Sequence, residues 1–298
     1  MKMLNFGSLN IDFVYSVEHF VKAGETLSST KLDKFCGGKG LNQSVALARA
    51  GAKTFHAGCV GTDGGMLLDI LQKNEVNTDF VQTKNSASGH AIIQVDKKGQ
   101  NCILLYNGAN HAISTEQVDQ VLAQFTSDDV LLLQNEINNL EYIINKAYSR
   151  GMKIALNPSP VNEQLTILPL DKINWLILNE VEGNQLTSRT EPEDILAVIQ
   201  QKYACSTIVL TLGKDGVICS DGPKIVRHGI YHVPVIDTTA AGDTFTGYFL
   251  ACITNGESVE ESLRIASVAS SIAISREGAA QSIPTMEEVK RAALTLQV

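Results

Sequence analysis

The chain lacks the features that mark membrane-bound, secreted or nucleic-acid-binding proteins. Its 298 residues contain no apolar run long enough to cross a membrane and no run of basic residues. The N-terminal MKMLNFGSLNID is typical of a first strand and not of a signal peptide. A net charge of −8 argues against nucleic acid and anionic membranes as partners. We therefore expect a soluble, cytoplasmic protein.

Cysteine pairs are also missing. The six cysteines are scattered, none forms a CxxC pair, and several lie in apolar runs such as HAGCVG and GVICSDG. Scattered, buried thiols are typical of a reducing compartment, and they predict neither a disulfide framework nor a zinc site. The six are Cys36, Cys59, Cys102, Cys205, Cys219 and Cys252.

Apolar runs of strand length alternate with helical patterns along the chain. Such runs flanked by helices predict a doubly wound, mostly parallel α/β sheet with helices on both faces. The hydrophobic fraction of 44% supports one large domain over residues 1–298. Strands are expected at 2–7, 54–60, 129–134, 153–157, 174–178 and 207–212, and helices near 41–51, 63–74, 114–124, 138–150, 191–203, 243–255, 257–275 and 285–296.

Two segments interrupt this alternation. Residues 12–36 and 88–106 are strand-like with polar residues interleaved, and KKGQ inside the second is typical of a hairpin turn. Neither segment has a helix nearby to cover it. We expect them to form a small antiparallel β-sheet that projects from the domain and serves as a lid or as a dimer contact.

The segment DTTAAGDTF places a carboxylate beside a turn of small residues where a helix is expected to begin. The first N–H groups of a helix lack internal partners, and with the macrodipole they amount to roughly half a positive charge. Ala241 and Gly242 leave room for an anion there, with Asp243 at the rim. Phosphoryl transfer to a hydroxyl needs this combination of backbone dipoles and a base. The alternative is that Asp243 is an ordinary helix cap, worth about 0.5–2 kcal/mol.

A glycine-rich turn, GGKG, precedes the helix expected at 41–51. Its glycines let the backbone approach a ligand, and it presents Lys39 and Asn42. The turn does not match the GxxxxGK[ST] of a Walker A loop, and the chain contains no GxGxxG fingerprint. The alternative is a plain strand-to-helix turn with a solvated lysine.

Asn10 and Asp12 follow the first expected strand. Two residues apart in extended backbone, they face the same side. An amide and a carboxylate together supply a donor and several acceptors, which suits neighbouring sugar hydroxyls. An ordinary Asx turn is the alternative.

Three successive strands end in amide or carboxylate side chains, at QNE, NPSP and NEVE. The carboxyl ends of parallel strands share one edge, where ligands bind. Glu182 lies three residues after Asn179, on the same helical face, and can hold a magnesium ion through water. A fourth strand ends in TLGKDG. This glycine turn either lies closely against a nucleotide or is only a β-turn.

In their order along the chain, these motifs resemble the ribokinase/phosphofructokinase-B family of sugar kinases over nearly the whole length. GGKGxNQ together with ALNPSP is most similar to the ribokinase branch. The resemblance implies ATP-dependent phosphorylation of a pentose, D-ribose at O5, by a homodimer joined through the β-lid. The matching segments are GSLNID (7–12), GGKGLNQ (37–43), NGAN (107–110), LLLQNE (131–136), ALNPSP (155–160), NEVE (179–182), TLGKDG (211–216) and DTTAAGDTF (237–245).

The same resemblance implies a role for each matching residue. Asp243 takes the proton of the terminal hydroxyl, and Ala241 and Gly242 form the anion hole for the γ-phosphoryl group. The sugar is bound by Asn10, Asp12, Gly38, Lys39, Asn42 and Glu136. ATP is bound by Asn179, Thr211, Leu212, Gly213, Lys214, Asp215, Gly216, Gly242 and Ser267. Glu182 helps to organise Mg²⁺, and K⁺ is held by Asp237, Thr239, Ala273, Arg276, Gly278 and Ser282.

Other functions stay open at this point. A kinase for deoxyribose, fructose or a nucleoside would carry similar motifs. A non-catalytic sugar or nucleotide sensor is disfavoured because it is free to lose Asp243, Gly242 and Lys39, which this chain retains. A nicotinamide-dependent dehydrogenase is disfavoured by the missing GxGxxG.

Overall fold

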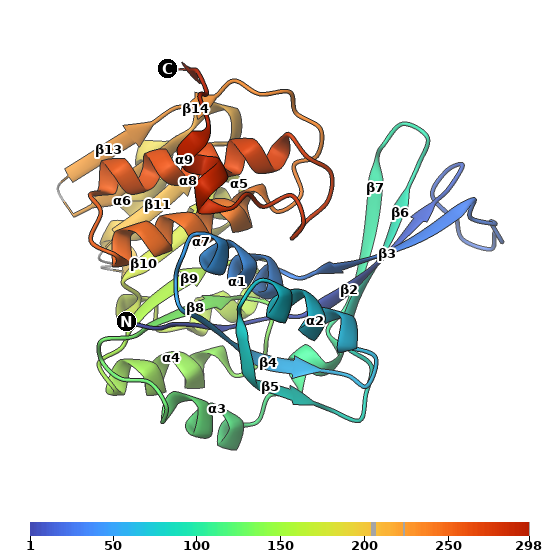
Figure 1. Cartoon of the computed structure of the whole chain (residues 1–298), viewed down its shortest axis with the longest axis horizontal. Helices are drawn as coiled ribbons and strands as arrows, with labels where there is room; N and C mark the ends of the chain where they lie inside the picture. The colour runs from blue at the N-terminus through green and yellow to red at the C-terminus, as the bar shows by residue number, and fades with distance from the viewer. Residues whose placement is uncertain (204–206, 223, 298) are drawn as a thin grey trace.

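A large sheet forms the centre of the molecule, with helices on both faces and a small sheet projecting from one side, as the computed structural model in Figure 1 shows. The structure describes residues 1–203, 207–222 and 224–297, and Cys205 lies outside them. The five cysteines within these ranges are free, and no helix there is long and apolar enough to span a membrane.

Nine strands of the described chain make up the central sheet. Seven neighbouring strands run parallel. At one edge the next strand is antiparallel to them, and the outermost strand is antiparallel to that one, so the expected doubly wound, mostly parallel sheet is confirmed. In spatial order the strands are β13 (Lys224–His228), β12 (Val217–Asp221), β11 (Thr207–Thr211), β10 (Trp175–Asn179), β9 (Lys153–Asn157), β8 (Val130–Gln134), β1 (Met3–Phe6), β4 (Thr54–Val60) and β5 (Asn77–Thr83).

The helices form two layers. One layer holds α3 (Thr115–Leu122), α4 (Leu140–Ser149), α5 (Glu180–Thr187) and α6 (Pro192–Tyr203), and the other holds α1 (Lys39–Arg49), α2 (Gly65–Lys73), α7 (Ala241–Thr254), α8 (Val259–Ile274) and α9 (Met286–Arg291). Short 3₁₀ turns lie at η1 (Gly108–His111), η2 (Glu163–Ile167), η3 (Leu170–Lys172) and η4 (Gly213–Asp215).

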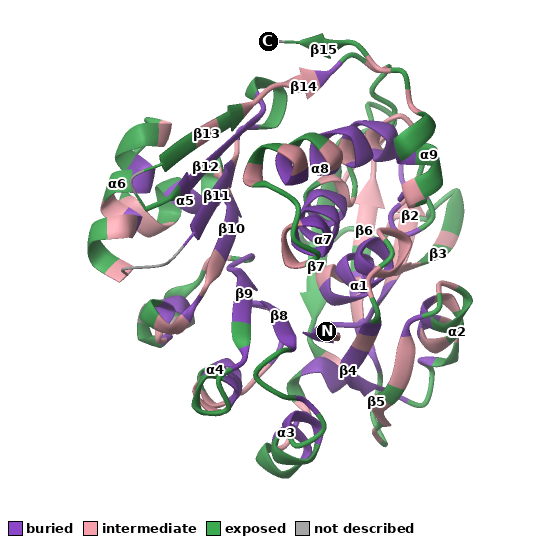
Figure 2. Cartoon of the chain, turned by 60° about the vertical axis from the view of Figure 1, so that its left-hand side comes forward, coloured by how far each residue is buried: buried purple, intermediate pink, exposed green. Residues whose placement is uncertain are grey.

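The buried strands are apolar on both sides because both layers cover them (Figure 2). In β8, Leu131 and Leu133 belong to the apolar cluster that includes α3, α4 and α6, whereas Val130 and Leu132 belong to the cluster of α1 and α7. A strand that is covered on both faces has a continuous hydrophobic sequence. The run VLLLQ therefore predicts a buried strand of the central sheet.

The projecting sheet consists of β3 (Lys31–Gly37), β2 (Asn10–Ser16), β6 (Gly89–Val95) and β7 (Asn101–Tyr106), in that order. It is built from the two segments that the sequence set apart, and a turn at KKGQ joins β6 to β7. The two outer pairs are antiparallel as expected, but the central β2–β6 pair is parallel. Each hairpin is antiparallel in itself, and the two hairpins lie side by side with their first strands together.

The helix expected at 285–296 is only half as long in the structure. It begins after Thr285, whose side chain forms a capping box with Glu288, and it ends at Arg291. Ala292 is already extended, with ψ at 120°. The chain then forms β15 (Leu296–Gln297), which pairs with β14 (Ile230–Tyr231), so strand pairing replaces the last helical turns.

Helices α1 and α7 cross at very close range. A Cβ on Gly247 would overlap the Cβ of Ala46 and lie 2.8 Å from the backbone nitrogen of Leu47. Glycine is therefore needed at this crossing. Asp243 and Gln43 lie one helical turn earlier on the two helices, so the crossing brings them together.

Candidate active site

Asp243 lies in the first turn of α7, where two side chains of α1 hold its carboxylate. Nδ2 of Asn42 donates to Oδ2 at 2.9 Å, and Nε2 of Gln43 donates to Oδ1 at 2.8 Å. The N-cap position is occupied by Ala240, whose φ is 60°, and not by Asp243. The carboxylate is therefore committed to α1 and does not act as the cap of its own helix.

A cavity of about 210 Å³ joins Asp243 to Lys39, the first residue of α1. Lys39 and Gly242 line it beside Asp243, and Asn179 and Thr211 line it from the ends of β10 and β11. These two strand ends are direct partners in the sheet register. The edge of amide and carboxylate side chains that the sequence predicted therefore borders the same space as Asp243, through Asn157, Asn179 and Glu182.

The N-terminus of α7 leaves room for an anion. A Cβ on Gly242 would meet no atom within 4 Å, so the space above this residue is open. The N–H groups of Gly242 and Asp243 have no partner within the helix, because they belong to its first turn. The N–H of Ala241 instead donates to the carbonyl of Thr238 at 3.2 Å. The available donors of the expected anion hole are thus centred on Gly242.

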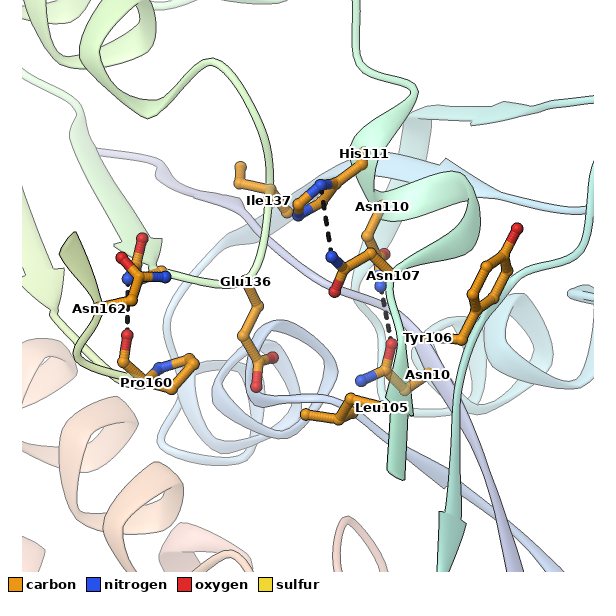
Figure 3. Close-up of a pocket in the computed structure, with 11 residues that line it drawn as sticks. Asn10, Leu105, Tyr106, Asn107, Asn110, His111, Glu136, Ile137, Pro160 and Asn162 are labelled. Atoms are coloured by element: carbon orange, nitrogen blue, oxygen red, sulfur yellow. Dashed lines mark hydrogen bonds between the residues drawn. The ribbon is translucent and has the colours of Figure 1, made fainter. Parts of the chain in front are cut away.

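A second cavity, of about 190 Å³, lies between the small sheet and the end of β8. Figure 3 shows Asn10 and Glu136 pointing into it from opposite sides, with Leu105 of β7 at its edge. Nδ2 of Asn110 donates to Oδ1 of Asn10 at 2.7 Å, while Oδ1 of Asn110 accepts from the N–H of Leu9 at 2.9 Å. With its oxygen already engaged, Asn10 offers its NH₂ group to a ligand.

Glu136 anchors the GGKG turn. Its Oε2 accepts from the backbone N–H of Lys39 at 3.0 Å and from the hydroxyl of Ser8. Gly38 has a φ of 92°, which only glycine adopts easily, and a Cβ on Gly37 would overlap the carboxylate of Asp12. The predicted sugar-binding residues are therefore gathered around one turn.

Burial and neighbouring charges shift the pKa values of Asp12, Lys39 and Glu136. Burial, with a smaller contribution from Glu136, raises the pKa of Asp12 to about 6. Burial also raises the pKa of Glu136, although Lys39 opposes it. Burial lowers the pKa of Lys39, but Asp243, Glu136 and Glu182 outweigh it and hold that pKa above its ordinary value. Lys39 thus stays cationic among carboxylates, in a position to attract an anionic ligand.

Several of the residues predicted for ATP, and Glu182 predicted for Mg²⁺, border the cavity of Asp243. Asn179 and Glu182 form the capping box of α5, with bonds of 2.8 and 3.0 Å, and both line the cavity of Asp243. Thr211 also lines it and continues into the η4 turn, where Lys214 and Asp215 are exposed. Ser267 is buried in α8, one helical turn before Ser270, whose hydroxyl donates to the carbonyl of Ala241 at 3.0 Å.

Hydrogen bonds link three of the predicted cation residues, Asp237, Thr239 and Gly278. Oδ1 of Asp237 accepts from Thr239, and Oδ2 accepts from the N–H of Gly278 at 3.0 Å. Burial raises the pKa of Asp237, but these hydrogen bonds outweigh it and leave that pKa below its ordinary value. Arg276 pairs with Glu288, and Ser282 donates to the carbonyl of Ala279. The N–H of Arg276 bonds the carbonyl of Ala273.

The sequence did not single out the roles of Gln43, Gln134 and Asn110, although all three fall inside quoted motifs. Each acts on another side chain that is remote along the chain. A signal was present in each case, since an amide in a segment that otherwise becomes buried must find a partner. The identity of that partner is a property of the fold.

Comparison with known proteins agrees with this geometry. The model of the pfkB family of carbohydrate kinases matches residues 2–286. A ribokinase of Haemophilus influenzae is 36% identical and one of Bacillus subtilis is 35% identical, and the chain covers 95% and 96% of their lengths. The crystal structure of a Cryptococcus neoformans ribokinase in complex with ADP matches with 35% identity and a TM-score of 0.85, covering 97% of this chain and 98% of that one.

An Arabidopsis thaliana ribokinase complexed with ribose and ATP has a TM-score of 0.87 at 29% identity, with 97% of both chains covered. The fold and the carboxylate beside an open helix N-terminus define an ATP-dependent kinase. The chain belongs to the pfkB family of carbohydrate kinases.

Proposed function

We propose that this chain transfers the γ-phosphoryl group of ATP to the terminal hydroxyl of a pentose, D-ribose at O5. The observation that carries the proposal is the shared cavity of Asp243, Lys39 and the open N-terminus at Gly242. A base, a cation and free backbone donors thus face one space. The most similar proteins described above are ribokinases, which supports ribose over other sugars.

In this reaction Asp243 accepts the proton of the attacking hydroxyl. Its two oxygens are oriented by Asn42 and Gln43, so the base is positioned before substrate arrives. The N–H groups at Gly242 stabilise the negative charge of the migrating group, and Lys39 adds a positive charge. Asn10 and Glu136 hold the remaining sugar hydroxyls, a donor from the first and acceptors from the second.

We also propose binding sites for Mg²⁺ and K⁺. Glu182 fits the first ion because it is a buried carboxylate on the cavity wall, and magnesium is often held by one carboxylate, waters and substrate phosphates. The described residues contain no cluster of three or more His, Cys, Asp or Glu for a metal, which agrees with a site completed by the nucleotide. Magnesium would neutralise phosphate charge. The Asp237 loop, with Thr239 and Gly278, would supply oxygens to K⁺ beside α7.

The projecting sheet is proposed to act as a lid and as the contact of a homodimer. We treat residues 1–298 as one kinase domain with the lid segments 12–36 and 88–106 inserted in it. Every residue of β7 is exposed, although four of the six are large and apolar. Such a surface is typical of a protein contact. We further propose a cytoplasmic location, where ATP is abundant and thiols stay reduced.

A coupled ADP-release assay over pentoses, hexoses and nucleosides, with and without K⁺, tests the proposal. We expect D-ribose to give the highest kcat/KM and K⁺ to raise the rate. A preference for deoxyribose, fructose or a nucleoside would replace ribose as substrate. A flat response over the whole panel would instead support a sensor, and an unchanged rate without K⁺ would remove the cation site.

A further inference from the structure

A buried chain of side-chain amides runs from Asp243 into the core. Of these amides, the reaction proposed above uses only Gln43. Nε2 of Gln43 donates to Asp243 at 2.8 Å, and Oε1 of Gln43 accepts from Nε2 of Gln134 at 2.6 Å. The same Nε2 of Gln134 donates to Oδ1 of Asn5 at 3.0 Å. Nδ2 of Asn5 in turn donates to Ser44 and to the carbonyl of Gly40.

The direction of every bond in this chain is fixed from both ends. An ionised carboxylate can only accept, so Gln43 must turn its NH₂ group toward Asp243 and its oxygen toward Gln134. A backbone carbonyl can also only accept, so Asn5 must turn its NH₂ group toward Gly40 and its oxygen toward Gln134. Gln134 therefore faces two acceptors, and both hydrogens of its NH₂ group are used.

The surrounding backbone holds Gln134 in this place. It is fully buried at the end of β8, between β1 and α1. A Cβ on Gly7 would overlap its Oε1, and a Cβ on Gly40 would overlap the backbone of Gly7 and Ser8. The two glycines let β1 and α1 approach so closely that the amide has little room to turn.

We propose that Gln134 is a positioning residue for the phosphoryl-transfer reaction, acting on Asp243 through the amide of Gln43. This inference rests on the proposed role of Asp243 as the base. A donor fixed toward a carboxylate favours its ionised form and restrains its direction. The NH₂ group of Gln43 also donates to Oδ1 of Asn157 at 3.2 Å, and Gln134 donates to the oxygen of Gln43 at 2.6 Å. Gln134 thus acts with Asn157 to keep that amide from turning its oxygen toward Asp243.

The test is Gln134→Glu, which keeps the size of the side chain but leaves at most one hydrogen for two acceptors. Gln43 then turns its NH₂ group toward the new carboxylate, so Asp243 keeps the hydrogen bond from Asn42 and loses the one from Gln43. We expect kcat to fall about 10-fold, the scale for losing one hydrogen bond to a charged group, with the KM for D-ribose changed by less than about 2-fold. The acidic limb of the kcat–pH profile should move to higher pH, because the ionised base is less favoured.

The matched control is Gln117→Glu. Gln117 is also a buried glutamine, but it donates to the carbonyl of Gly58 and has no link to Asp243. Its kcat and its acidic limb should stay as in the parent chain. Should Gln134→Glu fail to fold, the single variant Gln134→Met removes the same donor without adding a buried charge, and Gln117→Met is its control. We expect kcat and the acidic limb to shift in the same directions as for Gln134→Glu.

An Asp243→Ala background separates this inference from the proposed function. If Gln134 acts only through Asp243, Gln134→Met lowers kcat in the parent chain but not further in Asp243→Ala. Suppose that Asp243→Ala loses activity while folded Gln134→Met keeps the kcat and pH profile of the parent chain. That result would overturn the positioning role of Gln134 and leave the proposed function standing. Near-normal activity of Asp243→Ala would instead overturn the proposed function.

Discussion

At the scale of single residues, the site depends on its glycines as much as on its charged side chains. Gly242 borders open space in the cavity of Asp243, although it lies in a helix where alanine is normally preferred. A side chain there would stand where the migrating phosphoryl group is proposed to sit. Gly65, in the first turn of α2, also borders open space but lies outside both cavities.

We therefore expect Gly242→Ala to fold as well as the parent chain while kcat falls by roughly 10²-fold or more, the usual scale for disturbing an oxyanion-type site. Gly65→Ala should change neither property. Thermal unfolding and steady-state kinetics on both variants provide the check. Full activity of Gly242→Ala would mean that the phosphoryl group does not approach this backbone.

Asp12 gives a pH-dependent prediction. Its carboxyl has a pKa of about 6 in the folded chain against an ordinary 3.8, so folding disfavours the ionised form. The stability that its protonated form contributes is complete below about pH 4 and is lost as the pH rises through 6. Asp12→Asn should thus gain stability relative to the parent chain between pH 4 and pH 8, by an amount on the order of 2 kcal/mol. Urea unfolding at the two pH values measures it, and an equal difference at both would contradict the burial argument.

At the scale of elements, the central strands were predictable and the polar elements were not. Strands such as β9 and β11 read as continuous apolar runs because both faces are covered. The edge strand β5, NTDFVQT, and the helix α5, EVEGNQLT, are largely polar, so neither stood out from a loop. Strand β5 is held by its pairing with β4, and helix α5 is started by the capping box of Asn179 and Glu182.

The crossing of α1 and α7 sets the position of the base. Gly247→Ala inserts a methyl group against Ala46 and Leu47, and helix α7 must move away from α1. Overpacking of this kind costs about 1–3 kcal/mol. We expect a lower unfolding midpoint and also a lower kcat, because Asp243 lies one turn from the contact. Chemical denaturation with kinetics on the same samples tests this, and a stable variant with normal kcat would show that the helices repack freely.

At the scale of the whole molecule, the sequence predicted the central sheet, the strands of the projecting sheet and the neighbourhood of Asp243, Lys39 and Glu136. It did not predict which side chains hold these groups. Asn110 lies 100 residues from Asn10, and Gln43 lies 200 residues from Asp243, so only the fold brings them together.

The projecting sheet leads to a prediction about assembly. Leu104 of β7 is 67% exposed, and Ile225 of β13 is 54% exposed at the far edge of the central sheet (Figure 1). If the lid joins two copies, Leu104→Asp should shift the chain from dimer to monomer in analytical ultracentrifugation, because a buried unpaired charge is costly at an interface. Ile225→Asp should leave the assembly unchanged. A monomeric parent chain, or a dimeric Leu104→Asp variant, would contradict the lid contact.

The central claim is that the carboxylate of Asp243 removes the proton from the sugar hydroxyl. It is tested most directly by the turnover number of Asp243→Ala with ATP and D-ribose, measured on protein shown by circular dichroism and thermal unfolding to be folded. The account predicts a loss of at least about 10²–10⁴-fold, the scale of general base catalysis. A folded variant with near-normal turnover would contradict it.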